Sequence, residues 1–235
     1  MLQTGTIPQG GKVQLHISEK HKGYKGMAMW YLTNSETGGG LEMVINNEYF
    51  SISCLDSIPT SKSIIYKNTQ ENTFGSTNYQ EQQAIFAKHD AMLYATRAYS
   101  KTHELYPVFT KEYKLIAEQY NQYVKKLKSS PLYAARFREI TNITMGIGTI
   151  ITQDENLKAQ NINEIIVNQL DYEVLYTSNH WGGIINTWVQ LQTMVIKNDK
   201  KFIADARTIL NRMPSSLIYT EFNQRINQSW QRQSY

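Results

Sequence analysis

Short runs of alternating hydrophobic and polar positions fill the first 67 residues, a pattern typical of half-buried β-strands. Residues 12–17 alternate most strictly, from Lys12 to Ile17. Asn46 and Asn47 separate two other runs, and because asparagine tolerates positive φ, the pair suits a tight hairpin turn. The candidate strands are residues 12–17, 27–32, 41–45, 48–54 and 63–66. Together they predict a small antiparallel β module.

From about residue 76 the apolar positions recur at spacings of three and four, the period of amphipathic helices. Thr77 and Gln80 fit a capping box that begins the first helix, which continues to about residue 102. Ser130, Asn179 and Asn198 are candidate N-caps of later helices. The later apolar stripes cover residues 109–127, 132–143, 161–170, 181–191, 202–210 and 218–230.

The change of hydrophobic period near residue 70 predicts an α+β fold with two parts. The first part is a small antiparallel β domain over residues 1–67, with too few strands for a full sandwich. Residues 68–75 are predicted to form a linker, and residues 76–235 an all-helical domain.

Composition narrows the classes of function. The chain is 41% hydrophobic, which is enough for a core, and its net charge of +4 is mild. The lysines at 125–128 and 197–201 lie near predicted helix ends, where cations complement the helix dipole. Without a strongly basic face or a recognisable motif, we predict no nucleic-acid partner. No apolar stretch approaches the roughly 18 residues of a membrane span, so none is predicted.

Three segments together resemble a known family: residues 64–74, residues 130–137, and residues 170–181 with the helix that follows. They are similar to the region that precedes the thioredoxin domain in TlpA/ResA-like thiol–disulfide oxidoreductases of Bacteroidetes. The resemblance covers roughly residues 40–190. It implies a small β domain and a helical segment next to a thioredoxin-like domain. It also implies a periplasmic or otherwise extracytoplasmic location. Residues 1–11 lack the features of a signal peptide, so a cytoplasmic protein stays open as the alternative.

The family's chemistry requires a Cys-x-x-Cys motif, in which one thiolate attacks and the second resolves the mixed disulfide. This chain contains one cysteine, Cys54, which we expect to be a small buried residue on the second strand of the hairpin. No catalytic residue is therefore carried over. The resemblance instead implies a non-catalytic accessory module that positions the redox domain, in cis, or holds a protein or peptide partner.

Other chemistry finds little support in the sequence. The five histidines show no metal-binding spacing, and no cofactor motif is present, so we predict neither metal nor cofactor. Glu71 is a candidate acid or base, but the segment Thr69–Asn72 is better interpreted as a polar link that caps the following helix. We therefore predict no catalytic residue.

Residues 177–183 are the best candidate for a role beyond packing. Ser178, His180, Trp181, Gly182 and Gly183 lie at a predicted helix start, where amide groups attract anions and glycines permit close approach. We predict an interaction surface at these five residues. In the simpler alternative the helix is only capped there, and its tryptophan anchors the core. Two other functions stay open: a stand-alone extracytoplasmic binding protein, and a hydrolase with a pocket near the histidine and tryptophan.

Overall fold

The computed structural model describes residues 5–6, 8, 11–31, 40–55, 60 and 63–233, with side-chain exposure up to residue 228. A single 3-10 turn, η1 (Glu19–His21), precedes the strands. The described strands form two separate antiparallel pairs, β1 with β2 and β3 with β4. The strands are β1 (Lys25–Tyr31), β2 (Gly40–Asn46), β3 (Ser51–Cys54) and β4 (Ile64–Lys67).

Helices account for most of the rest of the chain. They are α1 (Gln70–Ala98), α2 (Tyr106–Ser129), α3 (Tyr133–Thr144), α4 (Glu155–Glu164), α5 (Tyr172–Thr177), α6 (Trp181–Gln190), α7 (Asp199–Asn211) and α8 (Ser216–Gln233). Two π-helical segments, η2 (Ile165–Gln169) and η3 (Leu191–Ile196), continue α4 and α6. The predicted α+β fold, with an N-terminal β module followed by helices, is confirmed.

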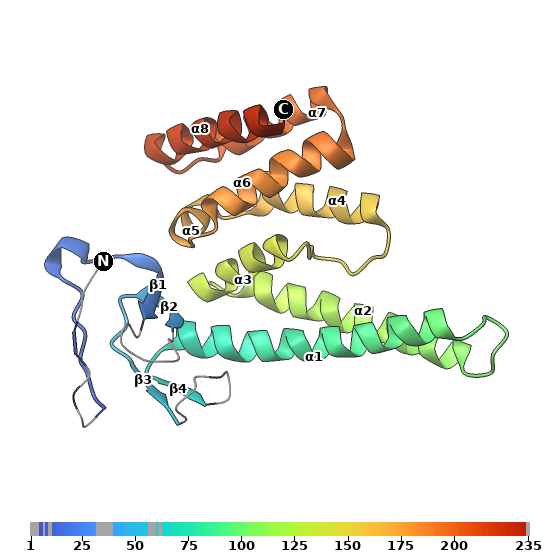
Figure 1. Cartoon of the computed structure of the whole chain (residues 1–235), viewed down its shortest axis with the longest axis horizontal. Helices are drawn as coiled ribbons and strands as arrows, with labels where there is room; N and C mark the ends of the chain where they lie inside the picture. Colours follow the sequence, from blue (N-terminus) through green and yellow to red (C-terminus); the bar gives the residue numbers. More distant parts are fainter. Residues whose placement is uncertain are drawn as a thin grey trace.

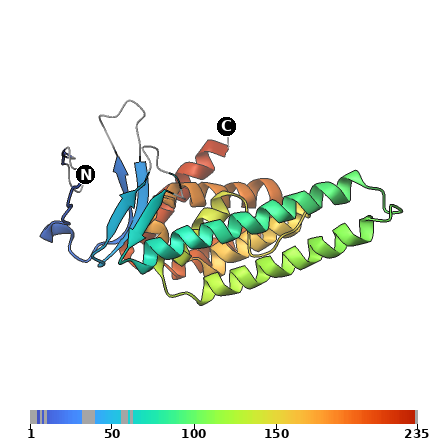
Figure 2. The ribbon, with the colours of Figure 1, turned by 90° about the horizontal axis from the view of Figure 1, so that it is seen from below.

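The helices stack roughly in chain order (Figure 1). The long α1 and α2 run antiparallel and extend away from the strands, which lie at the N-terminal end of α1 (Figure 2). The shorter helices α3 to α6 cover this hairpin, and α7 and α8 form the far side of the stack (Figure 1). None of the described helices combines the length and the apolar character that crossing a membrane would require.

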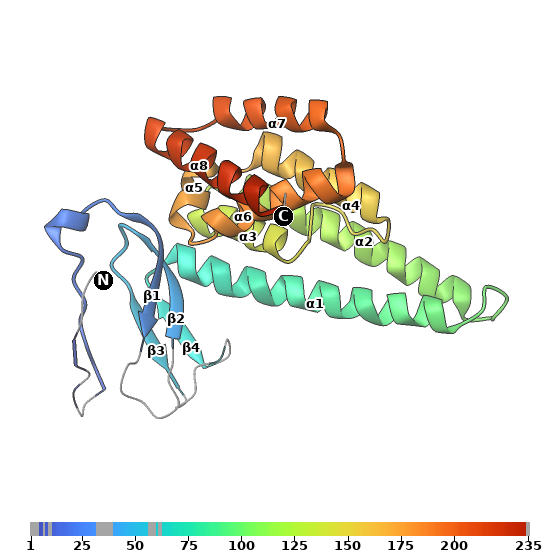
Figure 3. The same ribbon diagram turned by 45° about the horizontal axis from the view of Figure 1, so that its top comes forward.

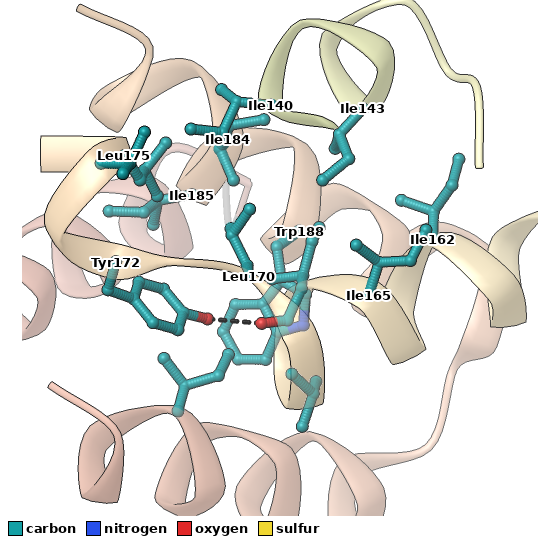
Figure 4. Close-up of a cluster of buried hydrophobic side chains, with 14 of the residues drawn as sticks. Ile140, Ile143, Ile162, Ile165, Leu170, Tyr172, Leu175, Ile184, Ile185 and Trp188 are labelled. Carbon is teal, nitrogen blue, oxygen red and sulfur yellow. Dashed lines mark hydrogen bonds between the residues drawn. The ribbon is translucent and has the colours of Figure 1, made fainter. Parts of the chain in front are cut away.

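The main hydrophobic core lies between the shorter helices. Trp188 is fully buried at its centre, and the Tyr172 hydroxyl donates a hydrogen bond to the Ile166 carbonyl at 2.6 Å (Figure 4). A second buried cluster joins α1, α2 and the start of α3. Its α2 members Ile116, Tyr120, Tyr123 and Leu127 belong to the stripe expected from the sequence.

The β module differs from the prediction in its pairing. β2 pairs with β1 and not with the strand that follows it, so Asn46 and Asn47 do not form the expected hairpin, although Asn47 has a positive φ of 53°. The Asn72 side chain explains the difference. It accepts from the Val44 N–H at 2.8 Å and donates to the Val44 carbonyl at 3.0 Å, and so occupies the edge of β2 that faces away from β1.

Residues 12–17 form no strand, contrary to the prediction. Val13, Leu15 and Ile17 are all exposed, so the alternating pattern does not place its apolar side chains on a buried face. Alternation predicts a strand only where a partner strand and a core receive it.

The first helix begins six residues earlier than predicted, so the linker prediction is wrong over residues 70–75. Thr69 caps α1 by accepting from the Asn72 N–H at 3.2 Å. Thr77 lies inside the helix, where its hydroxyl donates to the Thr73 carbonyl at 2.9 Å. Both threonines have the local chemistry of a cap, and the tertiary contacts of Asn72 favour the earlier one.

Of the other predicted N-caps, one is confirmed and two are not. Asn198 caps α7 by accepting from the Lys201 N–H at 3.0 Å, as expected. Ser130 follows the last residue of α2, and Leu132 takes the N-cap position of α3, so that prediction is wrong. Asn179 has a φ of 66° and forms the turn before α6, whose N-cap is His180.

Glu71 joins the β module to the helices. This carboxylate is almost fully buried, accepts from the Tyr133 N–H at 3.1 Å and the Ala134 N–H at 2.8 Å, and also accepts from Asn46 Nδ2 at 2.6 Å. It therefore caps α3 across 62 residues of sequence, and not the helix on which it lies, as the sequence had suggested. Val44 of β2 belongs to the main helical core, so the two parts share buried side chains.

Candidate functional site

The segment before α6 is a tight connection between two helices. Asp171 caps α5 by accepting from the Glu173 and Val174 amides, both at 3.0 Å. Ser178, with a relative exposure of 1%, donates its hydroxyl to the Leu175 carbonyl at 2.7 Å. Its oxygen also accepts from the His180 N–H at 3.2 Å. Ser178 therefore holds the turn together and does not face solvent.

The other predicted residues do not converge on one point. The His180 ring packs against Phe137, with ring centroids 5.6 Å apart. Gly183 is exposed, and a Cβ there would meet nothing within 4 Å. Trp181 and Gly182 line a pocket, so they are the two predicted residues that lie together at a concave surface.

Trp181 lies at the rim of the core. It is neither a fully exposed interaction residue nor a fully buried core residue, the two alternatives that the sequence left open. Its ring makes edge contacts with Tyr176 and Phe222, at centroid distances of 5.5 and 6.2 Å, and it is partly buried. Its indole Nε1 is shielded from solvent and finds no acceptor among the described residues. Trp188 differs, since its Nε1 donates to Asn163 Oδ1 at 3.0 Å.

The pocket lies between α6 and α8, which pack side by side (Figure 3). Its volume is about 420 Å³, and its lining comprises Trp181, Gly182, Glu221, Gln224, Arg225 and Gln228. The four α8 residues occupy positions i, i+3, i+4 and i+7 and so form one stripe of the helix, beside the core-facing stripe that contains Phe222. That polar stripe is a signal in the sequence, but nothing local to α8 connects it with α6.

Arg225 closes the pocket against the first turn of α6. A Cβ at position 182 would lie 2.5 Å from Arg225 Nη2 and 2.9 Å from Cζ, so only glycine lets the guanidinium pack there. Arg225 Nε is buried without a hydrogen-bond partner, and Arg225 makes no ion pair within 4.0 Å in the part of the chain that the structure describes. Glu221 lines the same pocket but leaves this cation unpaired.

The first turn of α6 and the Arg225 guanidinium are positive, and the Glu221 carboxylate on the same pocket wall carries the opposite charge. The first-turn amides of Trp181, Gly182 and Gly183 have no acceptor within the helix, and among the described residues no side chain caps α6. The amide dipoles place partial positive charge at this end, and the guanidinium adds a full one. Such a site favours an anionic or strongly accepting group. The ionisable groups among the six lining residues are Glu221 and Arg225.

Three features outside this pocket bear on other possible sites. Cys54 is exposed on β3, contrary to the prediction that it is buried, and its thiol lies 3.6 Å from Ser63 Oγ. Among the described residues, no group of three or more histidine, cysteine, aspartate or glutamate side chains is placed to hold a metal ion. A hollow of about 490 Å³ near the start of α2 is lined by that helix alone, including Tyr106 and Leu115.

The chain was compared with protein-family models, with curated proteins and with solved structures, and none of the three comparisons found a match. The family resemblance therefore depends on the three sequence segments that carry it, at residues 64–74, 130–137 and 170–181.

Proposed function

We propose that this chain is a non-catalytic accessory module of an exported thioredoxin-like thiol–disulfide oxidoreductase. Its role is to hold the redox domain or that domain's partner at the corner between α6 and α8. The observation that carries the proposal is Trp181, a partly exposed tryptophan beside a pocket, with a buried N–H that no described residue accepts. Tryptophan is enriched at the centres of protein interfaces because one rigid side chain buries a large area.

The chemistry available to the chain supports binding over catalysis. One thiol, Cys54, cannot form an internal disulfide, and it is exposed on β3, in the other part of the molecule from the pocket. A hydrolase acting through His180 is the alternative from another class, and it gains less support, because that ring packs on Phe137 and is not among the pocket-lining residues. A stand-alone extracytoplasmic binding protein would use the same pocket with a different partner.

The test begins with the reading frame that encodes the chain. A thioredoxin-like domain with a Cys-x-x-Cys motif, encoded in the same frame, is the first bait for binding by calorimetry. We expect the isolated chain to bind this domain. Gln228→Trp, at an exposed position of the pocket wall, should block the pocket and weaken binding by about tenfold or more.

The matched control is Met194→Trp, which adds the same side chain at a position 64% exposed and outside the pocket lining. It should leave the affinity unchanged. Absence of binding, or equal effects of the two variants, would contradict the proposal. Turnover of a hydrolase substrate panel that is lost in His180→Ala would favour the enzyme instead.

A further inference from the structure

We propose that the pocket between α6 and α8 binds a carboxylate group of a peptide or protein partner. This inference rests on the proposed interaction function and names the chemistry that the surface recognises. The carboxylate would lie against the Arg225 guanidinium and the first turn of α6, with Trp181 as the apolar wall.

The first argument is the set of donors without acceptors. Trp181 Nε1 and Arg225 Nε are both buried and unpaired within the described part of the chain. A buried donor without a partner costs about 1–3 kcal/mol, so two on residues that line one pocket need an explanation. The first-turn amides of α6 add further donors beside them. Both side-chain nitrogens are shielded from solvent, so an acceptor group that enters the pocket pairs with them only when the Trp181 and Arg225 side chains turn towards it.

The second argument is the position of the guanidinium. Arg225 lies against Gly182, at the positive end of α6, where the helix dipole opposes a cation. A bound anion converts this unfavourable contact into a favourable one, because it interacts with the amides and the guanidinium together. Gly182 is what permits the arrangement, since any Cβ at this position would displace Nη2.

The third argument selects a carboxylate over a phosphate. Glu221 lines the pocket one helical turn before Arg225, and its charge disfavours a dianion more than a monoanion. The planar guanidinium matches two oxygens of either group, so the choice between them depends on Glu221. Gln224 and Gln228 add neutral amide groups suited to a peptide backbone, and about 420 Å³ is within the usual range for a ligand pocket.

The same molecule contains an example of this recognition. At the start of α3, the Glu71 carboxylate accepts from two first-turn amides at 3.1 and 2.8 Å. A partner's carboxylate at α6 would make contacts of the same kind, with Arg225 in addition.

The experiment uses the whole chain and three acetylated tripeptides of otherwise equal composition, with binding followed by two-dimensional NMR and calorimetry. One carries a free C-terminal carboxylate, one is amidated and neutral, and one is amidated with a glutamate side chain. We expect both carboxylate peptides to bind more tightly than the neutral one, and their order identifies the source of the group. Equal binding of the neutral peptide, or tighter binding of inorganic phosphate, overturns the proposal.

Three variants locate the site. Gly182→Ala should displace the guanidinium and weaken carboxylate binding by about tenfold, whereas Gly183→Ala, with open space around its Cβ, should not. Arg225→Gln should weaken it as well, and its melting temperature establishes that it is folded. Equal affinities of all these variants overturn the proposal.

The redox domain is titrated against the same variants. If it binds all of them equally while carboxylate peptides fail to bind, the inference is wrong and the proposed function stands. If it fails to bind the unmodified chain, the proposed function is wrong.

Discussion

The first-turn amides of α3 and of α6 both lack acceptors within their own helix, and the two helix ends differ in what lies opposite those amides. At α3, the buried carboxylate of Glu71 accepts from the Tyr133 and Ala134 amides and ties the helix to α1 and β2. At α6, the first turn faces the Arg225 guanidinium and has no side-chain acceptor. One end is completed by the chain's own carboxylate, and the other presents donors and a cation to a pocket.

The difference indicates what each end is for. A buried helix end that is completed internally serves stability, because its acceptor is always present. An end that concentrates unpaired donors beside a pocket departs from that rule, and such departures are expected where a protein binds something else. The α3 end is therefore interpreted as structural and the α6 end as functional.

The largest effect is expected from Glu71→Ala. It leaves the Tyr133 and Ala134 amides and the Asn46 side chain without their shared acceptor, at about 1–3 kcal/mol for each buried donor. We expect urea denaturation to show a loss of about 3–5 kcal/mol in the free energy of unfolding.

Glu81→Ala is the control for that variant. Glu81 pairs with Lys126 at the surface, where removal should cost less than about 1 kcal/mol. If the two glutamate variants were equally stable, the α3 end would not depend on its internal carboxylate. The interpretation of that end as structural would then be wrong.

The two tryptophans of α6 should respond in opposite directions when each is replaced by phenylalanine. Trp188→Phe breaks the hydrogen bond to Asn163 and opens a cavity in the core, so we expect a loss of about 1–3 kcal/mol. Trp181→Phe removes a buried N–H that has no described partner, so its stability should stay equal or rise. Thermal unfolding of both variants, without ligand, is the measurement. A large loss in Trp181→Phe would show that its N–H is satisfied.

Alkaline pH should act on the α3 end. Burial is the main reason that the pKa of Tyr133 rises from 10.0 to about 12. The unfolded chain therefore loses this proton first, and stability present below pH 10 is lost as pH rises towards 12. For Tyr133 alone this amounts to about 1 kcal/mol near pH 11. Urea denaturation at pH 8 and 11 should show a smaller pH-dependent loss in Tyr133→Phe. An unchanged loss would contradict this prediction.

The smallest effects on stability are expected at the two glycines of α6. Gly183→Ala should be neutral or stabilising by up to about 1 kcal/mol, because alanine reduces the freedom of the unfolded chain. Gly182→Ala gains the same term but must displace the end of the flexible Arg225 side chain. Differential scanning calorimetry should rank Gly183→Ala above Gly182→Ala. The reverse order would mean that the guanidinium does not pack on position 182.

Features set by local sequence could be predicted. The change of period placed strands before helices, and the spacing along α2 identified Ile116, Tyr120, Tyr123 and Leu127 as a buried face. Asn198 was recognised as a cap because its partner lies three residues away. In each case the residues that decide the structure are neighbours in sequence.

Features set by distant partners could not be predicted. Glu71 was interpreted as part of a polar link that caps the following helix, because its true partners, the α3 amides, lie 62 and 63 residues away. The pairing of β2 depends on Asn72, and four of the six residues that line the pocket come from α8. The residues around Trp181 were predicted to form an interaction surface because they combine a helix start with glycines. Arg225, the cation of the pocket, lies on another helix, so only the folded chain shows that it belongs to the site.

The most direct test of the account compares the two helix ends in one titration. Two-dimensional NMR would follow the backbone amides of Gly182 and Tyr133 and the indole N–H of Trp181 while the free-carboxylate tripeptide is added at constant ionic strength. We predict saturable shifts at Gly182 and Trp181, with Tyr133 unchanged because Glu71 already occupies its acceptor position. Equal shifts at both helix ends, or no saturable shift at Gly182 and Trp181, would contradict the account.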